Sequence, residues 1–121
     1  MTLKRIKTEN RRLNPAYANF IQEVGRYCWR CGRKGHQRPE WWNAPFGLER
    51  CHLFTNPRLE DRRVVFCACS LCHRIQHGDR FQEDPRKPLP LEHLIDLKRQ
   101  WDPDYFDLEF LQKCSLRRLS G

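Results

Sequence analysis

The chain has 121 residues, which is enough for one domain with a modest hydrophobic core and too few for two ordinary domains. No apolar run approaches the roughly 20 residues that a membrane-spanning helix requires, so the sequence predicts no membrane partner. The formal net charge is +8, with 23 Lys and Arg against 15 Asp and Glu, and this charge favours a polyanionic partner, most commonly a nucleic acid.

The N-terminal part of the chain is predicted to hold a basic arm and one short helix. Residues 1–13 are rich in Lys and Arg, and their charged start lacks the apolar core of a secretory signal, so we expect an intracellular, cytoplasmic protein. Asn14-Pro15 is typical of a helix N-cap followed by proline at the first helical position. A helix is therefore predicted from this point to Gly25.

Two strands and a helix are predicted in the middle of the chain. Residues 48–54 have the pattern of a short strand. Residues 63–69 are rich in β-branched and aromatic side chains and predict a second strand. A helix is expected from Cys72 to about His77.

The C-terminal part of the chain is predicted to be helical. A proline-punctuated linker over residues 84–90 precedes a helix with Leu94 and Trp101 on one face. Asp102-Pro103 is typical of an N-cap and a first helical residue, so a last helix is expected to begin there.

Two Cys-x-x-Cys pairs are the strongest chemical signal in the sequence. Cys28 and Cys31 stand in a glycine-containing turn, and Cys69 and Cys72 stand where the second strand is expected to lead into a helix. Four cysteines in this arrangement can form a closed, tetrahedral site for a structural Zn²⁺. The odd total of seven cysteines argues against a disulfide scaffold.

Two histidines follow the second cysteine pair directly. His73 and His77 are four residues apart, so on a helix they share one face. A closed structural zinc site needs no further ligands, and the pair therefore indicates a second, open metal site beside the first. The alternatives are that His73 supports the zinc thiolates and that His77 caps the end of the helix.

The order of these motifs resembles the HNH, or ββα-metal, nuclease superfamily in its zinc-stapled form, in which many members are phage or mobile-element proteins. The resemblance covers about residues 28–80. It rests on the run LERCHLF at residues 48–54 and, more specifically, on the run CSLCHRIQH at residues 69–77. It implies a small zinc-stapled ββα-metal, treble-clef-like core, and with the predicted N- and C-terminal helices around this core the expected fold class is α+β.

Together with the predicted flanking helices, the sequence is expected to divide into three parts. A basic arm would occupy residues 1–13, a helix and the zinc domain residues 14–84, and a helical extension packed on the core residues 85–121. A protein of this kind encoded by a phage would act in the host-cell cytoplasm.

Carried over residue by residue, the resemblance implies a metal-dependent endonuclease that hydrolyses DNA phosphodiester bonds, most naturally by nicking one strand. His52 would be the general base that takes a proton from the attacking water. His73 and His77 would hold a divalent metal, Mg²⁺, Mn²⁺, Ni²⁺ or Zn²⁺, that neutralises phosphate charge and stabilises the leaving oxygen. DNA is thus the expected partner, RNA stays open, and a protein partner could supply sequence specificity.

Two positions depart from the family pattern. Cys51 stands where the family usually has Asp or His, so either Cys51 is not a ligand or the working ion is softer than Mg²⁺. The family's central Asn should fall near Arg63 or Val64, and Asn56 in the intervening loop is a candidate to replace it. These departures motivate an alternative function, a catalytically decayed, zinc-stabilised nucleic-acid-binding or assembly adaptor module.

Basic residues near these motifs are candidates for phosphate contacts. They fall in two groups, one on the first cysteine turn and one in the loop between the strands: Arg30, Arg33, Lys34, Arg38, Arg58, Arg62 and Arg63. The other explanation for them is surface charge that keeps the protein soluble.

Overall fold

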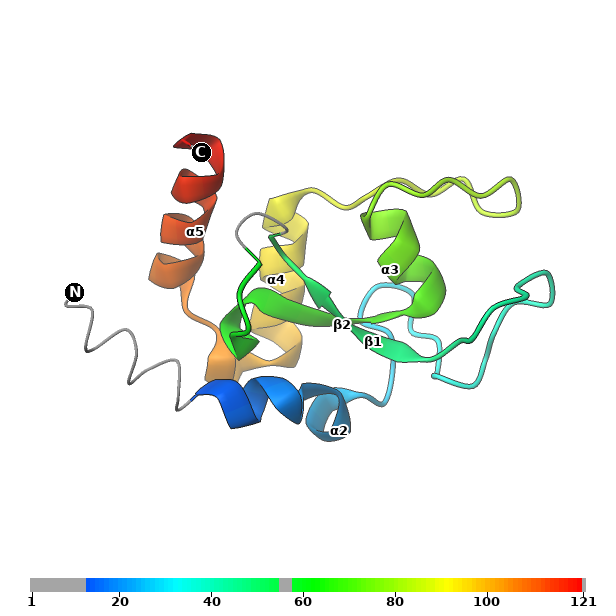
Figure 1. Cartoon of the computed structure of the whole chain (residues 1–121), viewed down its shortest axis with the longest axis horizontal. Helices are drawn as coiled ribbons and strands as arrows, with labels where there is room; N and C mark the ends of the chain where they lie inside the picture. The colour runs from blue at the N-terminus through cyan, green and yellow to red at the C-terminus, as the bar shows by residue number, and fades with distance from the viewer. Residues whose placement is uncertain (1–12, 55–57, 121) are drawn as a thin grey trace.

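The computed structural model describes residues 13–54 and 58–120, with side chains to residue 115, and shows a small mixed α/β protein (Figure 1). Its sheet has two antiparallel strands, β1 (Leu48–His52) and β2 (Val65–Cys69). The register pairs Leu48 with Cys69 and His52 with Val65. The predicted arm, apart from residue 13, and the loop position Asn56 lie outside the described residues.

The second strand is shorter than the sequence predicts because a 3₁₀ turn precedes it. This turn, η1 (Arg62–Val64), follows Asp61, whose side chain accepts a hydrogen bond from the backbone N–H of Arg63. The same carboxylate pairs with the Arg63 guanidinium at 2.7 Å. These contacts favour a turn over an extended conformation, so the strand begins only at Val65.

The N-terminal segment is helical over residues 13–18 and again in α2 (Phe20–Val24), which ends at Gly25 as predicted. The predicted N-cap is wrong, because Leu13 and Asn14 already belong to the first helical stretch. Leu13, Tyr17 and Phe20 are buried at helical spacing, so this segment is fixed by packing on the core.

Helix α3 (Ser70–Gln76) follows β2 without a loop, and this junction positions the functional residues (Figure 1). Cys69 is the N-cap, and its sulfur accepts a hydrogen bond from the backbone N–H of Cys72. The helix therefore starts before Cys72, where the sequence placed it. The side chains at the end of β2 and on the first turns of α3 are held in one rigid unit.

The C-terminal helices are α4 (Leu91–Trp101) and α5 (Leu108–Ser120), separated by the 3₁₀ turn η2 (Pro103–Tyr105). Asp102-Pro103 opens the short turn η2 and not the last helix as predicted, and the Asp102 carboxylate does not cap it because it is bound by the side chains of Arg62 and Lys98. Asp107 accepts a hydrogen bond from the backbone N–H of Phe110 at the start of α5 instead. On α4, Leu94 is buried as the pattern predicts, whereas Trp101 remains 47% exposed.

One hydrophobic core joins all of these elements. Phe66 and Leu71 from the β2–α3 unit, Phe20 from α2, and Leu94 and Leu111 from the C-terminal helices belong to it. In Figure 1, α3 and α5 stand at opposite ends of the sheet, with α4 between them and the N-terminal helices along the lower edge. Within the described residues, no helix is long and apolar enough to cross a membrane.

Candidate functional site

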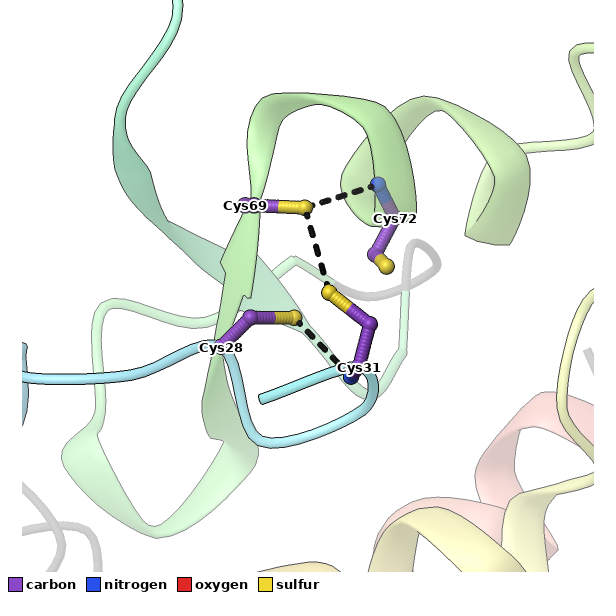
Figure 2. A group of neighbouring side chains, drawn as sticks. All are labelled: Cys28, Cys31, Cys69 and Cys72. Carbon is purple, nitrogen blue, oxygen red and sulfur yellow. Dashed lines mark hydrogen bonds between the residues drawn. The ribbon is translucent and has the colours of Figure 1, made fainter. Parts of the chain in front are cut away.

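Cys28, Cys31, Cys69 and Cys72 come together as the sequence predicts, with sulfur atoms all within 4.8 Å of one another (Figure 2). The sulfurs of Cys31 and Cys69 are 3.8 Å apart. A tetrahedral zinc ion with Zn–S bonds of about 2.3 Å separates its sulfurs by about 3.8 Å, so the four thiols fit such an ion. This cluster can hold a structural metal such as zinc.

The local backbone explains how the first cysteine turn reaches this geometry. Gly32 adopts a φ of 76°, a conformation that side chains disfavour, and its N–H donates to the carbonyl oxygen of Cys28 at 2.9 Å. The N–H of Cys31 donates to the sulfur of Cys28 at 3.5 Å. Hydrogen bonds with the neighbouring thiols, first that of Cys31, lower the pKa of the Cys28 thiol, which favours the thiolate that a metal requires.

Arg86 supports the cluster from outside, and sequence reasoning missed it. Its guanidinium donates to the sulfur of Cys72 at 3.3 Å and is held by Asp84 at 2.8 Å. A cation beside a thiolate offsets part of the charge that four thiolates bring to one zinc ion. Arg86 lies in the proline-punctuated linker, where nothing in the sequence pattern points to the cysteines.

A second group of donor atoms lies beside the first, formed by Cys51, His73 and His77. One ligand atom from each lies within 4.8 Å of the others. The two histidines are one turn apart on α3 and at its C-cap, and their Nε2 atoms are 3.0 Å apart. Cys51 is fully buried on β1, and burial raises the pKa of its thiol. A metal bound here would therefore displace the proton from Cys51.

The orientation of His73 is fixed by Glu49, a residue that sequence reasoning also missed. The Nδ1 of His73 lies 2.8 Å from Oε1 of Glu49, and the other carboxylate oxygen accepts a hydrogen bond from the Ser70 hydroxyl at 2.8 Å. A carboxylate that holds Nδ1 leaves Nε2 available to bind a metal, and this arrangement is typical of metal-binding histidines. The sequence did contain a signal for Glu49: it lies two residues before Cys51 on a predicted strand, so the two side chains face the same side.

His52 faces the other side of β1 from Cys51, toward the N-terminal helix. It is 9% exposed, and its Nε2 lies 3.1 Å from the Tyr17 hydroxyl. Burial lowers the pKa of His52 to about 4, and the positive charges of Arg58 and Arg50 contribute, so the imidazole is neutral near pH 7. No sequence pattern could have predicted the contact of Tyr17 with His52, because this contact depends on where the N-terminal helix packs.

A pocket of about 380 Å³ connects these residues. It is lined by Cys51, His52 and His77 and, from the linker and α4, by Pro88, Leu89, Pro90, Leu91 and Leu94. Gln76 holds the linker in place, since its amide bonds both the carbonyl oxygen and the N–H of Leu89, at 3.0 and 2.8 Å. These two hydrogen bonds tie the linker to α3 beside the candidate ligands.

Most of the basic residues proposed for phosphate contacts on the first cysteine turn have contacts within the protein. Arg30 donates to the carbonyl oxygen of Lys87, and Arg38 donates to that of Trp42. Arg33 and Lys34 lie over the rings of Phe46 and Tyr27. Arg58 is exposed, and its positive charge contributes to lowering the pKa values of both His52 and His77.

Arg62 and Arg63 are not on the surface, so the structure corrects the expectation that they contact phosphate. Arg62 is 4% exposed, pairs with both carboxylate oxygens of Asp102 and contacts Glu23. Arg63 is buried against Asp61. Both guanidinium groups stabilise the fold, and a phosphate could reach them only if these ion pairs broke.

Comparisons of this chain with protein-family models, with characterised proteins and with solved structures found no match.

Proposed function

We propose that this protein is a metal-dependent endonuclease that hydrolyses DNA phosphodiester bonds, as the resemblance to HNH nucleases implies. The observation that carries the proposal is the shared pocket: Cys51 and His52 at the end of β1 and His77 at the C-cap of α3 line the same cavity. A candidate base beside a candidate metal site with an open approach is the arrangement that phosphodiester hydrolysis needs.

The residues of the second cluster fit a divalent metal by the chemistry of their donors. One sulfur and two imidazole nitrogens converge, and a carboxylate orients one of the rings. A metal bound there would neutralise charge on the phosphate and stabilise the leaving oxygen.

In the proposed reaction, His52 is the general base. It accepts a proton from the water whose oxygen attacks phosphorus, the bond from phosphorus to the 3′ oxygen breaks, and that oxygen takes a proton from solvent. The products are a 5′-phosphate and a 3′-hydroxyl. Tyr17 is the proposed positioning residue: its hydroxyl lies 3.1 Å from Nε2, and in the tautomer that carries the proton on Nε2 it would accept that N–H and leave Nδ1 as the basic nitrogen.

Arg58 is the residue proposed to hold the DNA backbone at the pocket. It is exposed, and its charge acts on both His52 and His77. The net charge of +8 would bring DNA to the surface without regard to sequence. The described residues form no helix-turn-helix, so sequence preference would come from a partner.

The proposal is tested with a supercoiled-plasmid nicking assay on protein that keeps its structural zinc and receives Mg²⁺, Mn²⁺, Ni²⁺ or Zn²⁺. We expect nicking that depends on the added metal and disappears in His52→Ala. The matched control is His93→Ala, which removes an exposed imidazole on α4 and should nick like the wild type. Equal nicking by His52→Ala and wild type would refute the assigned base.

One observation favours the alternative function, a zinc-stabilised nucleic-acid-binding or adaptor module. His52 is nearly buried and its Nε2 is already engaged by Tyr17, as in a purely structural histidine. Such a module would bind one zinc tightly and would retard DNA in a gel at low salt. Retardation without nicking, for every metal supplied, would decide for this alternative.

A further inference from the structure

We propose that Cys51 is the third protein ligand of the second metal site, and that its thiolate makes this site selective for Zn²⁺ and similar ions over Mg²⁺. The inference names the metal of the proposed hydrolytic site, so its catalytic meaning rests on the proposed function. Metal binding itself is a separate property, and it is measured separately below.

The first argument is the convergence of three donors from two elements. Cys51 lies on β1, whereas His73 and His77 lie on α3 and at its C-cap, yet their ligand atoms lie within 4.8 Å of one another. The Nε2 atoms are 3.0 Å apart, and a tetrahedral zinc with Zn–N bonds of about 2.0 Å separates two nitrogens by about 3.3 Å. A small adjustment of the side chains would thus bring the donors to bonding distance of one ion.

The second argument is that one ligand is already oriented by its surroundings. Glu49 lies two residues before Cys51 on the same face of β1 and holds Nδ1 of His73, while Ser70 holds Glu49. This chain of contacts turns Nε2 of His73 toward the cluster. A structural surface histidine would need no carboxylate that is itself held by a second hydrogen bond.

The third argument compares Cys51 with Cys67, a second fully buried thiol on the neighbouring strand. The sulfur of Cys67 donates to the carbonyl oxygen of Tyr27 at 3.5 Å, the contact expected of a core cysteine. The sulfur of Cys51 has imidazole nitrogens near it instead. Both cysteines are buried in strands, but Cys51 pairs with Phe66 and Cys67 pairs with Arg50, so they face opposite sides of the sheet. Of the two, Cys51 is the one whose sulfur lies with the ligand atoms of His73 and His77.

The donor set decides which metal fits. Mg²⁺ requires oxygen ligands in an octahedral arrangement and binds thiolates poorly, whereas one thiolate and two imidazoles suit Zn²⁺, Co²⁺ or Ni²⁺. Three protein ligands also leave one tetrahedral position open, as in catalytic rather than structural zinc sites. Cys51 and His77 line the pocket, so a fourth ligand could reach the ion from that side.

The experiment uses cobalt as the probe and the full-length protein. One equivalent of Zn²⁺ first fills the four-cysteine cluster, which is then spectroscopically silent, and Co²⁺ is titrated into the second site. We expect thiolate-to-cobalt charge-transfer absorption in the near ultraviolet for the wild type. Cys51→Ala should lose that absorption and bind cobalt at least about tenfold more weakly.

Two further variants keep the test decisive. Cys67→Ala removes a buried thiol that is not a proposed ligand and should keep the charge-transfer absorption. Cys51→Asp should keep cobalt binding without that absorption and should gain affinity for Mg²⁺ or Mn²⁺. Cobalt bound by the wild type without charge-transfer absorption, or not bound at all, would overturn the inference.

The failure of this inference and the failure of the proposed function give different results. If charge-transfer absorption depends on Cys51 but the protein fails to nick DNA whichever metal is supplied, the nuclease proposal is refuted and the proposed metal site stands. Nicking with Mg²⁺ that is unchanged in Cys51→Ala would support the nuclease and refute the thiolate ligand.

Discussion

Lys98 is a buried cation whose charge should make the stability of the fold depend on pH. Its side chain is fully buried on α4 beside Phe20 and Trp29. Its amino group donates to Asp102 at 2.7 Å and to the carbonyl oxygen of Arg62 at 2.6 Å. Burial lowers the pKa of Lys98 from 10.5 to about 8; the charges of Asp102 and Asp61 oppose this effect, and that of Arg62 adds to it.

The magnitude follows from that difference in pKa. At 1.36 kcal/mol for each pKa unit, lowering the pKa from 10.5 to about 8 corresponds to about 3 kcal/mol. The unfolded chain binds the proton of Lys98 more tightly than the folded protein does. The charged lysine therefore destabilises the fold fully below pH 8, and the free energy of unfolding rises as the pH increases from about 8 to 10.5.

The assay is urea unfolding of zinc-loaded wild type and Lys98→Met between pH 7 and 10.5. The difference in their free energies of unfolding isolates Lys98, because the cysteines and tyrosines are common to both proteins. We expect the wild type to gain about 3 kcal/mol relative to Lys98→Met across this range. Lys113→Met, at an exposed position on α5, should change with pH like the wild type. A difference that stays flat, or that falls with pH, would refute the reasoning.

Three other predictions concern the site and its support. Tyr17→Phe should slow nicking about 3- to 10-fold, change its pH profile and cost about 1 kcal/mol of urea stability, because a buried hydrogen bond to His52 is lost; an unchanged rate would exclude a positioning role. Arg58→Ala should reduce the slope of log DNA affinity against log salt concentration by about 0.9. Arg62→Met should leave that slope unchanged and cost about 3 kcal/mol of stability in urea unfolding. The reverse pattern would contradict the assignment of Arg58 to the surface and of Arg62 to the core. Cys28→Ser should lose the tightly bound zinc and cooperative thermal unfolding, as measured by metal analysis and circular dichroism, and retention of both would exclude a structural zinc.

The four-cysteine cluster could be predicted because its information is local. Each Cys-x-x-Cys pair forms its own turn, with an N–H donating to the first sulfur, so the spacing alone defines half of a site. The two strands and α3 were predicted for a similar reason, since β-branched and apolar residues mark β2 and the cysteine pair marks its end. The sequence placed the start of α3 at Cys72, whereas the helix begins at Ser70. Cys69, the last residue of β2, is its N-cap, so no loop separates the strand from the helix.

The remaining contacts depend on residues far apart in the chain, and no local pattern reports them. Arg62 was expected on the surface because arginine usually is, yet its partner Asp102 lies forty residues later. Tyr17 reaches His52 across thirty-five residues. Whether Cys51 joins the two histidines depends on the packing of β1 against α3, which is why the sequence left its role open and the structure places it in the cluster.

The two clusters are joined through α3, and this has a consequence for the order of metal binding. The helix has seven residues, too few to be stable alone, and the four-cysteine cluster holds its start through Cys69 and Cys72. His73 and His77 follow directly on the same helix, so the geometry of the second cluster depends on how well the four-cysteine cluster fixes the start of α3. The reverse dependence is weaker, because the cysteine turns have their own backbone hydrogen bonds. Four thiolates are the donor set of a closed structural zinc site, so we expect the first equivalent of zinc to fill the four-cysteine cluster, and a second ion would then bind on a helix that the first had already fixed.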